Sequence, residues 1–549
     1  MKSFLLLFIC LPFFGVGQNM PQKHWIQFTD KQSTPHSLSN PLTFLSQRAL
    51  DRRAAQNIPL TQNDLPVDPA YIQQVWAEGA TVLSTSKWFN SVSVLVSDSA
   101  TLKAIWKLPF VKQTQAVARF KKDRETNKED VKSRLATAET DLASEADYGT
   151  AFNQIDMLHG VSLHNKGFMG QGMLIAVLDG GFANLDLLPV FDSLINDGRI
   201  LATWDFVSQE EMVYNDASHG TMVMSTMAAY QPGAMIGTAP RASYLLLRTE
   251  DDASEFPIEE DYWVAGAEYA DSAGADVINS SLGYTTFDDS SFDHTYADMD
   301  GNTTRSAIGA DIAASKGMLV VCSAGNEGNS NWKHIGSPAD GDSVLAIGAT
   351  DKDGFRASFS SVGPSSDGDI KPNVCAQGLQ ATVANALGSV TSGNGTSFAG
   401  PIIAGMAACL WQAYPQLTNM QIFRAIEESG HLHSNPDFLM GHGIPNFALA
   451  NLQLSKMVPK NLQEDELFKI YPNPFLDGVE GVFYSSVSQH VLVRLVNNVG
   501  QEIDRFEHNA QEMCNVPFRF LNLNHQAAGI YYLQIVTGTG SYRRKLLKL

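Results

Sequence analysis

The sequence predicts an α/β protein whose central domain is built on a parallel β-sheet, flanked by two smaller domains of other classes. The first observation is a series of apolar runs between residues 148 and 455 that lack a period of two, as strands buried on both faces do. The second is that helix-like segments alternate with these runs, which is typical of a parallel sheet covered on both sides. The third is a change after about residue 455, where short strands separated by turn residues indicate an antiparallel β-sandwich.

Individual elements of the central domain can be assigned in chain order. Two segments, residues 262–274 and 303–317, have helical patterns, and the second is closed by a glycine. The apolar runs are the predicted strands of the parallel sheet. They cover residues 173–179, 244–248, 276–283, 318–322 and 344–350.

Composition is that of an ordinary globular protein and excludes one class of partner. The 549 residues are too many for one compact core, so three or more domains are expected. Hydrophobic residues make up 44% and charged residues 17%, which suits a protein with a sizeable core. The formal net charge is −20, whereas a surface that binds nucleic acid needs an excess of Lys and Arg. Nucleic acid is therefore not an expected partner.

The first residues are typical of a secretory signal peptide. Lys2 precedes an apolar run over residues 4–14 that is too short to anchor the chain in a membrane, and Gly15 and Gly17 supply small residues for cleavage. We predict removal of residues 1–17, and a buried N-terminal helix is the alternative. Later apolar runs are too short or too interrupted to predict a transmembrane anchor.

Four cysteines follow the predicted signal peptide. Export permits disulfides, and four cysteines allow three pairings, which the sequence leaves open. Two of them lie in an apolar strand-like run and in an apolar helix, where inert buried thiols are common, so structural roles are favoured for all four. They are Cys322, Cys375, Cys409 and Cys514.

A small α+β domain is predicted over residues 18–118. Short alternating stretches such as residues 91–97 predict strands, and helical patterns lie between them. The following residues 119–134 contain 11 charged side chains among 16 and cannot bury much apolar surface. We interpret residues 119–147 as a charged linker that is open to proteolysis, with a charged helix face as the alternative.

Three segments carry, in chain order, a carboxylate, an imidazole and a hydroxyl in settings that suit nucleophilic catalysis. Asp179 ends an apolar strand, His219 opens a helix-like run, and Ser397 stands where a glycine-rich turn meets an apolar helix. In such a set the serine attacks, the histidine takes and returns the proton, and the aspartate orients the histidine. Asn326, in the segment SAGNEG, has an amide that could bind an oxyanion. Taken singly, each residue has a structural alternative, such as capping a turn or a helix.

Together the four segments resemble those of the subtilisin-like serine proteases (subtilases), over residues 148–455. The order Asp, His, Ser is the subtilisin order. The resemblance implies a subtilisin-like parallel-sheet core, catalysis by these three residues, and the amide of Asn326 as oxyanion donor. Met222 stands where a second histidine is usual in the family, which implies altered packing behind the site rather than lost chemistry.

The resemblance also implies how substrate binds. The backbone of Ser281, Leu282 and Gly283 would pair with the substrate, facing Ala324 and Gly325. Pairing through the backbone leaves sequence preference to side-chain pockets, so broad specificity is implied.

The two flanking domains carry resemblances of their own. By its place before the core, the domain over residues 18–118 resembles the inhibitory pro-domain of subtilases. Residues 465–549 contain the segments YPNPF, NNVGQEI and GIYYLQI and the basic ending RRKLLKL, and they resemble the C-terminal sorting domains of Bacteroidetes cargo for type IX secretion. An ordinary β-sandwich for binding or stability is the alternative. Sorting implies passage through the periplasm to the cell surface or the medium, with the type IX secretion machinery as a partner.

An acidic stretch is a candidate metal site. Asp298, Asp300 and Asn302 alternate around Gly301, which partly echoes a calcium loop, and the resemblance adds that many subtilases bind calcium. The downstream bidentate glutamate of a complete EF-hand loop is missing, so a solvated acidic turn is favoured.

The sequence therefore predicts a secreted serine endopeptidase made as a precursor, which acts on protein or peptide substrates and requires no cofactor, with calcium as a candidate ion. The alternative is a non-catalytic surface or adhesion protein on a subtilase scaffold. The intact set of four site residues argues against that alternative, because a dead enzyme has no reason to keep all four.

Overall fold

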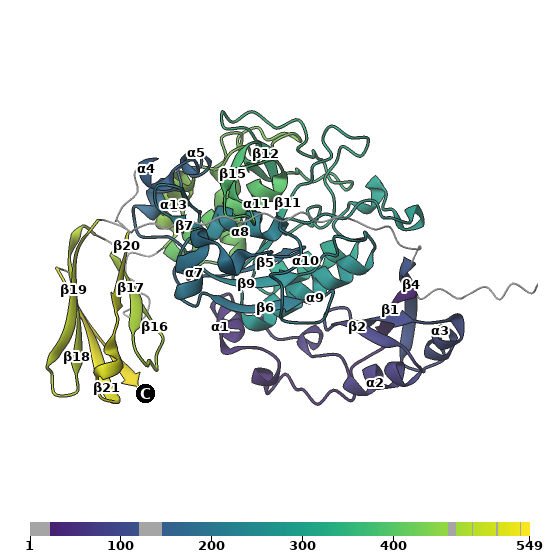
Figure 1. Ribbon diagram of the computed structural model, residues 1–549, viewed down its shortest axis with the longest axis horizontal. Coiled ribbons are helices and arrows are strands. Elements are labelled where there is room, and N and C mark those ends of the chain that lie inside the picture. The colour runs from purple at the N-terminus through teal and green to yellow at the C-terminus, as the bar shows by residue number, and fades with distance from the viewer. Residues whose placement is uncertain (1–21, 120–144, 459–467, 486, 512–513, 539) are drawn as a thin grey trace, which may run out of the picture.

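The structure, a computed structural model, describes residues 22–119, 145–458 and 468–549, apart from 486, 512–513 and 539. The predicted signal peptide and most of the predicted linker lie outside the described residues. Three domains follow one another along the chain, and the central one lies between the other two (Figure 1). Within the described ranges, no helix is both long enough and apolar enough to cross a membrane.

The N-terminal domain is a four-stranded antiparallel sheet in the order β2-β3-β1-β4. Helices α2 and α3 pack on one face of this sheet around an apolar core of their own. The opposite face of the sheet lies against the central domain. The domain thus consists of an antiparallel sheet with helices on one face, and the α+β prediction is confirmed. The elements are β1 (Gln22–Phe28), α1 (Gln47–Ala55), α2 (Pro69–Ala77), β2 (Thr81–Ser86), β3 (Ser91–Val96), α3 (Ser99–Trp106) and β4 (Val111–Arg119).

The central domain contains a seven-stranded sheet in the order β13-β12-β11-β10-β5-β9-β6, in which every pair is parallel. All five predicted strands are present, whereas the two edge strands, β6 and β13, were not singled out from the sequence. The strands are β5 (Leu174–Asp179), β6 (Ile200–Asp205), β9 (Ser243–Arg248), β10 (Val277–Ser280), β11 (Leu319–Ser323), β12 (Val344–Thr350) and β13 (Val374–Gln377).

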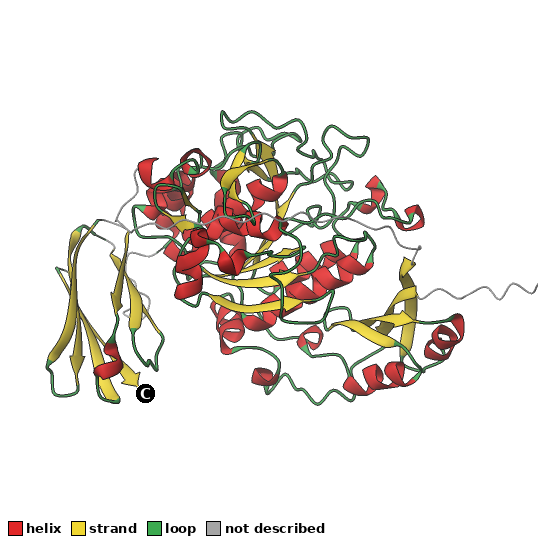
Figure 2. Ribbon diagram, in the orientation of Figure 1, coloured by secondary structure: helices red, strands yellow, loops and turns green. Residues whose placement is uncertain are grey.

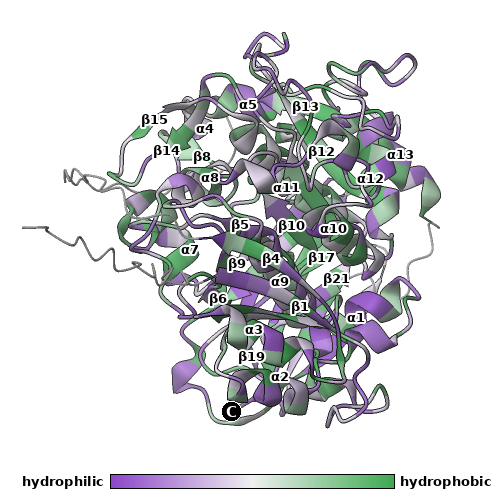
Figure 3. Ribbon diagram, turned by 90° about the vertical axis from the view of Figure 1, so that its right-hand side faces the viewer, coloured by the Kyte–Doolittle hydropathy of each residue, from purple (hydrophilic) through white to green (hydrophobic). Residues whose placement is uncertain are grey.

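Helices cover both faces of this sheet (Figure 2). On one face lie α8 (His219–Ala228) and α11 (Thr396–Ala413), and on the other lie α9 (Ile258–Ala273) and α10 (Arg305–Ser315). Alternate residues of the strands enter the two apolar cores, because successive side chains point to opposite faces. Every residue of α11 is buried, and Figure 3 shows hydrophobic segments gathered at the centre of the domain.

Shorter elements complete the central domain. Helix α13 ends two residues beyond the predicted end of the domain at residue 455. The elements are α4 (Glu145–Tyr148), α5 (Phe152–Asp156), α6 (Val161–His164), α7 (Asp192–Asn196), β7 (Tyr230–Gln231), β8 (Met235–Ile236), β14 (Ala381–Ala384), β15 (Val390–Gly393), α12 (Asn419–Glu428) and α13 (Phe447–Met457).

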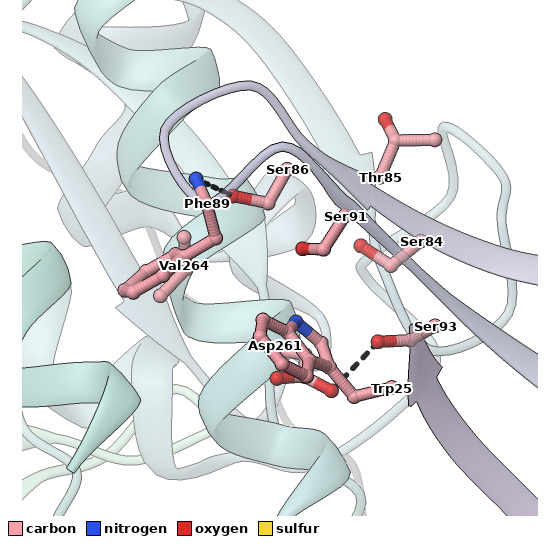
Figure 4. Close-up of a pocket in the computed structure, with 9 residues that line it drawn as sticks. All are labelled: Trp25, Ser84, Thr85, Ser86, Phe89, Ser91, Ser93, Asp261 and Val264. Carbon is pink, nitrogen blue, oxygen red and sulfur yellow. Dashed lines mark hydrogen bonds between the residues drawn. The ribbon is translucent and has the colours of Figure 1, made fainter. Parts of the chain in front are cut away.

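The N-terminal domain holds helix α9 through buried carboxylates. Glu268 accepts hydrogen bonds from the Ser86 hydroxyl (2.6 Å) and from the backbone N–H groups of Lys87 (2.8 Å) and Trp88 (2.9 Å). Two turns earlier on α9, Asp261 accepts a hydrogen bond from the hydroxyl of Ser93 in β3 (2.7 Å), in a small pocket that Figure 4 shows between the sheet and α9.

A cluster of buried charges joins the same two domains. Asp271, near the end of α9, accepts from Arg52 (2.6 Å), Arg53 (2.8 Å) and Lys87 (3.0 Å), and its side chain has no exposed surface. All three cations belong to the N-terminal domain. Burial opposes ionisation of Asp271, yet the charges of Lys87, Arg52 and Arg53 outweigh it and lower the pKa of Asp271 to about 2.

The C-terminal domain is a sandwich of two antiparallel sheets around one apolar core, as predicted. The first sheet has the order β16-β17-β20 and the second β19-β18-β21-β22. The strands are β16 (Phe468–Tyr471), β17 (Val479–Ser485), β18 (Gln489–Asn497), β19 (Glu502–Ala510), β20 (Cys514–Phe520), β21 (Gly529–Thr537) and β22 (Ser541–Lys548).

The last residues of the chain are built into this sandwich. The backbone N–H of Phe475 donates to Leu547 O (2.9 Å), and that of Leu549 donates to Phe475 O (2.9 Å). Lys548 is 5% exposed and its ammonium group donates to the backbone oxygen of Leu476. Of the four cations in the basic ending, Lys548 therefore has a structural role.

The four cysteines are all buried and unpaired in the structure. Burial raises the pKa of the Cys322 and Cys375 thiols to about 12, so these thiols stay protonated and unreactive at neutral pH. Structural roles were favoured from the sequence, and the structure agrees.

Candidate active site

The carboxylate and the imidazole of the predicted set meet at the carboxyl edge of the parallel sheet. Asp179 is the last residue of β5, and its buried Oδ1 accepts from the backbone N–H of Gly180 (2.8 Å) and from Nδ1 of His219 (2.9 Å). His219 is the first residue of α8, and 36% of its side chain is exposed. The charge of Asp179 raises the pKa of His219, and burial opposes it. The hydrogen bond on Nδ1 leaves Nε2 of the ring for proton transfer.

Ser397 is the second residue of α11, and the residue that follows it lies against the histidine. The ring of its neighbour Phe398 is 6.0 Å from the His219 ring, centroid to centroid. The Ser397 hydroxyl is 3.3 Å from the backbone oxygen of Ser281 and donates to it, so the structure does not join it to His219 by a hydrogen bond. A rotation about the Cα–Cβ bond redirects such a hydroxyl, and catalytic hydrogen bonds in enzymes without substrate are often made only in the substrate complex.

Asn326 lies in the turn that follows β11, with its amide held in a fixed orientation. Its Oδ1 accepts from the backbone N–H (2.9 Å) and from the hydroxyl (3.1 Å) of Thr396. This leaves Nδ2 as the free end of the amide. A methyl group placed on Gly395 would lie 3.6 Å from the Ser397 backbone nitrogen, 3.7 Å from Asn326 Nδ2 and 3.7 Å from Ser397 Cβ. The two donors and the serine side chain therefore border the same small space.

The predicted substrate segments follow two neighbouring parallel strands. Ser281, Leu282 and Gly283 come directly after β10, and Ala324 and Gly325 come after β11. Within the described part of the chain, the backbone groups of Leu282 and Gly283 make no hydrogen bond and are available to a substrate.

The second segment is already engaged within the protein. The N–H of Ala324 donates to Ile347 O (3.0 Å), and that of Gly325 donates to the Thr396 hydroxyl (3.2 Å). Gly325 O accepts from Ser361 N (3.0 Å). These two residues can therefore line a substrate groove, but these backbone groups are not free to pair with a peptide.

The candidate calcium loop uses its oxygen atoms for local turns. Asp298 accepts from the backbone N–H and the hydroxyl of Thr295, both at 2.7 Å. Asp300 accepts from Asn302 N (2.9 Å) and from the Thr303 hydroxyl (3.0 Å). This agrees with the favoured acidic turn, and calcium binding there stays a prediction.

A group of acidic side chains beside the site was missed in the sequence. Carboxylate oxygens of Glu250, Glu255 and Glu259 all lie within 4.8 Å of one another, and the hydroxyl of Tyr284 donates to Glu250 (3.1 Å). Tyr284 follows the first substrate segment directly. Burial raises the pKa of Glu255 to about 7 and that of Glu259 to about 9. These glutamates belong to a run rich in acidic residues, in which nothing distinguishes a buried carboxylate from a solvated one.

Asp252 also went unnoticed, and it lies nearer the catalytic set. Its Oδ1 would be 2.8 Å from a methyl group placed on Gly180. Burial and then the charge of Asp179 raise the pKa of Asp252. Because its charge also acts on the His219 pKa, Asp252 contributes to the electrostatic setting of the imidazole.

Comparison with protein families assigns all three domains. The Subtilase family matches residues 170–443, the Peptidase S8 propeptide domain of Bacteroidota matches 23–134, and the Secretion system C-terminal sorting domain matches 469–548. The propeptide match thus reaches into the stretch predicted as linker.

Individual relatives agree with the family match. Subtilisin NAT of Bacillus subtilis subsp. natto is 33% identical over 299 residues, which are 54% of this chain and 70% of that protein. Subtilisin of Bacillus pumilus is 31% identical, over 54% of this chain and 97% of that protein. The crystal structure of MycP1 from Mycobacterium smegmatis is 22% identical with a TM-score of 0.43, over 56% of this chain and 86% of that one.

The family match and the two subtilisins define the class of protein as serine proteases. Within that class, the chain belongs to the Subtilase family. It carries a propeptide domain in front of the peptidase domain and, behind it, a sorting domain that marks it for secretion or export to the cell surface.

Proposed function

We propose that this protease is an endopeptidase that works through Asp179, His219 and Ser397, with an acyl-enzyme intermediate. The observation that carries the proposal is the 2.9 Å hydrogen bond between Asp179 and His219 at the sheet edge, next to the start of α11. A buried carboxylate on Nδ1 fixes the tautomer whose Nε2 accepts a proton, and it stabilises the imidazolium that follows.

The chemistry follows from these positions. Ser397 Oγ bonds to the carbonyl carbon of the substrate while its proton passes to Nε2 of His219, and the carbonyl electron pair moves onto the oxygen. Collapse of this intermediate expels the amine, which takes the proton from His219. Water then releases the acid by the same two steps. The side chains of the protein supply both the nucleophile and the proton transfer, so the reaction requires no cofactor.

The oxyanion would be bound by Asn326 Nδ2 and the backbone N–H of Ser397. Both donors border the space next to Gly395, and Thr396 holds the Asn326 amide so that its NH₂ group is presented. Donors fixed in advance lower the barrier by about 2.7–4 kcal/mol for a single side chain.

Substrates would be proteins or peptides bound in extended form along Ser281, Leu282 and Gly283. The free backbone groups of the last two residues support this arrangement, since β-strand addition uses the main chain of both partners. Preference for particular side chains then depends on the pockets alone, and broad specificity is expected.

A fluorophosphonate probe tests the catalytic assignment. The mature protein should be labelled, and Ser397→Ala should abolish labelling while the matched change Ser392→Ala, at an exposed serine in β15, leaves it intact. Failure to label the processed wild-type protein would instead support a non-catalytic surface protein on a subtilase scaffold.

We further propose that the N-terminal domain inhibits the peptidase until it is removed. Its contacts with Glu268, Asp261 and Asp271 on α9 support a stable complex between the two domains. The last described residue before the predicted linker, Arg119, lies over the ring of Phe292 in the central domain (5.4 Å), so the chain continues from the surface of the peptidase.

The type IX secretion machinery is the proposed partner of the C-terminal domain. Arg543 and Lys545 alternate on the exposed face of the edge strand β22, and Arg543 lies 3.8 Å from the centre of the Tyr532 ring. An exposed basic edge in a protein of net charge −20 is a distinctive surface for recognition.

A further inference from the structure

A pair of histidines lies on the loop between α12 and α13, in a part of the protein that the proposed catalytic chemistry does not use. The loop folds back on itself as a hairpin, with a hydrogen bond from Leu432 N to His442 O (2.9 Å) and a bridge between Asp437 and Gly441. This brings His433 and His442 side by side. Their rings lie 5.2 Å apart, centre to centre, and their Nδ1 atoms are 3.1 Å apart.

The other nitrogen of His442 has a carboxylate partner. Nε2 of His442 lies 3.6 Å from Oε1 of Glu427, and the same oxygen accepts from the amide of Asn373 (2.9 Å). A carboxylate there favours the tautomer with the proton on Nε2, which leaves a lone pair on Nδ1. At 3.6 Å the contact of His442 with Glu427 is an ion-pair contact, longer than a hydrogen bond. Histidines that bind metals almost always donate their second ring nitrogen to a carboxylate, a carbonyl or a water, and Glu427 lies where such an acceptor would be.

The separation of the two Nδ1 atoms fits a shared metal ion. Zinc binds histidine nitrogen at about 2.0–2.1 Å, so two such ligands in a tetrahedral arrangement lie about 3.3 Å apart. Imidazole nitrogen is a preferred ligand of zinc, copper and nickel.

A third histidine in the hairpin provides a contrast. Nδ1 of His431 accepts a hydrogen bond from the backbone N–H of Ile444 (2.9 Å), and its ring lies against Gly443. The Nδ1 lone pair of His431 is therefore held by a backbone N–H. The Nδ1 atoms of His433 and His442 are hydrogen-bonded to each other instead, a contact that an ion shared by the two rings would replace.

We propose that His433 and His442 form a binding site for a zinc ion, with Glu427 as the outer carboxylate that orients His442. The ion would bond to both Nδ1 atoms, and water would complete its coordination. The site ties together the two arms of the hairpin. The second arm is joined to β13 by a hydrogen bond from Cys375 N to Gly443 O (2.9 Å), and to the residue before that strand by one from His442 N to Asn373 O (2.7 Å). Its role is to stabilise this part of the fold, apart from the proposed catalytic residues.

Zinc titration of the full-length Ser397→Ala protein tests the proposal, since this variant is expected not to digest itself. After removal of bound metal with a chelator, ZnCl₂ is added in a calorimeter and in a thermal unfolding experiment. We expect His433→Ala and His442→Ala each to lose one bound zinc and the accompanying rise in Tm. The matched variant His431→Ala should keep both, and Glu427→Gln should bind about 10–100-fold more weakly.

Two outcomes would overturn the proposal. One is a zinc stoichiometry that is the same in His433→Ala as in the parent protein, which would assign the ion to other groups. The other is a parent protein that binds no zinc, which would leave the pair as a hydrogen bond between two imidazoles. His433 is exposed, so its replacement tests the site even if His442→Ala fails to fold.

Discussion

Removal of the Asp271 carboxylate should release the N-terminal domain from the peptidase. Asp271 is fully buried between Arg52, Arg53 and Lys87, at distances of 2.6, 2.8 and 3.0 Å. Asp271→Ala leaves these cations without that partner in a buried interface, and breaking a buried ion pair from one side costs about 3–5 kcal/mol. The expected loss of affinity for the N-terminal domain is therefore between about 10² and 10⁴-fold.

The pKa of Asp271 gives a second measure of the same interaction. Because the pKa is lowered from 3.8 to about 2 in the complex, the interaction favours the complex by about 2 kcal/mol at neutral pH. For a carboxylate with a lowered pKa, this contribution is complete above pH 3.8 and is lost as the pH falls towards about 2. The two figures agree in order of magnitude.

The assay is inhibition of the mature peptidase by added N-terminal domain, residues 22–119, which has an apolar core of its own. The inhibition constant of wild-type enzyme is compared with those of Asp271→Ala and of Asp353→Ala, which removes an exposed carboxylate paired with its neighbour Lys352. Only Asp271→Ala should weaken inhibition. An unchanged inhibition constant for this variant, with its Tm intact, would refute the argument that the buried charges hold the two domains together.

Four further predictions concern catalysis, maturation, pH and export. Asn326→Ala should lower kcat about 10²–10³-fold with little change in KM. Ser397→Ala should lower kcat about 10⁶-fold. If the two variants lowered kcat on a peptide substrate equally, the assigned roles would be contradicted. Because Asp179 raises the pKa of His219, kcat/KM should increase with pH as the imidazolium loses its proton, with a midpoint above pH 6.5. A midpoint below pH 6.5 would argue against the pairing of these two residues. The Ser397→Ala precursor should persist uncut between Arg119 and Tyr148, as mass spectrometry of the purified protein would show; trimming at the wild-type bond would mean that another protease cuts there. Deletion of residues 467–549 should spare hydrolysis but leave the protein in the periplasm of its host, and normal export of the truncated enzyme would reassign the C-terminal domain to stability or binding.

The sequence predicted the sheet well because its strands are buried on both faces. Runs such as residues 173–179 and 344–350 are apolar up to their last residue, and no solvated element has that composition. The edge strand β6 was missed because only one of its six residues is buried, so its pattern is that of a loop. The short strand β13 is fully buried but has only four residues, too few to establish a pattern.

The site was predicted in part. The contact between Asp179 and His219 could be predicted because each residue lies at the end of a regular element and the four motifs occur in one order. The position of the Ser397 hydroxyl on Ser281 O could not, since a rotamer is set by contacts across 116 residues of sequence. The burial of the glutamates beside Tyr284 could not be predicted either, because nothing in the sequence of an acidic run distinguishes a buried carboxylate from a solvated one.

The histidine pair shows the same limit. His433 and His442 are nine residues apart, and only the hairpin brings their rings together. A spacing of this length is not a recognised ligand motif, so the pair had no signal in the sequence.

The hydrogen bonds of Leu547 and Leu549 with Phe475 have a consequence for protein synthesis. The strand that completes the sandwich, β22, is synthesised after the other strands of the sandwich, and it pairs with residues made some seventy positions earlier. A chain that stops before this strand retains an unpaired edge and an open core, whatever the condition of its peptidase domain. A secretion apparatus that accepts only the closed sandwich would thereby reject proteases whose synthesis stopped before β22.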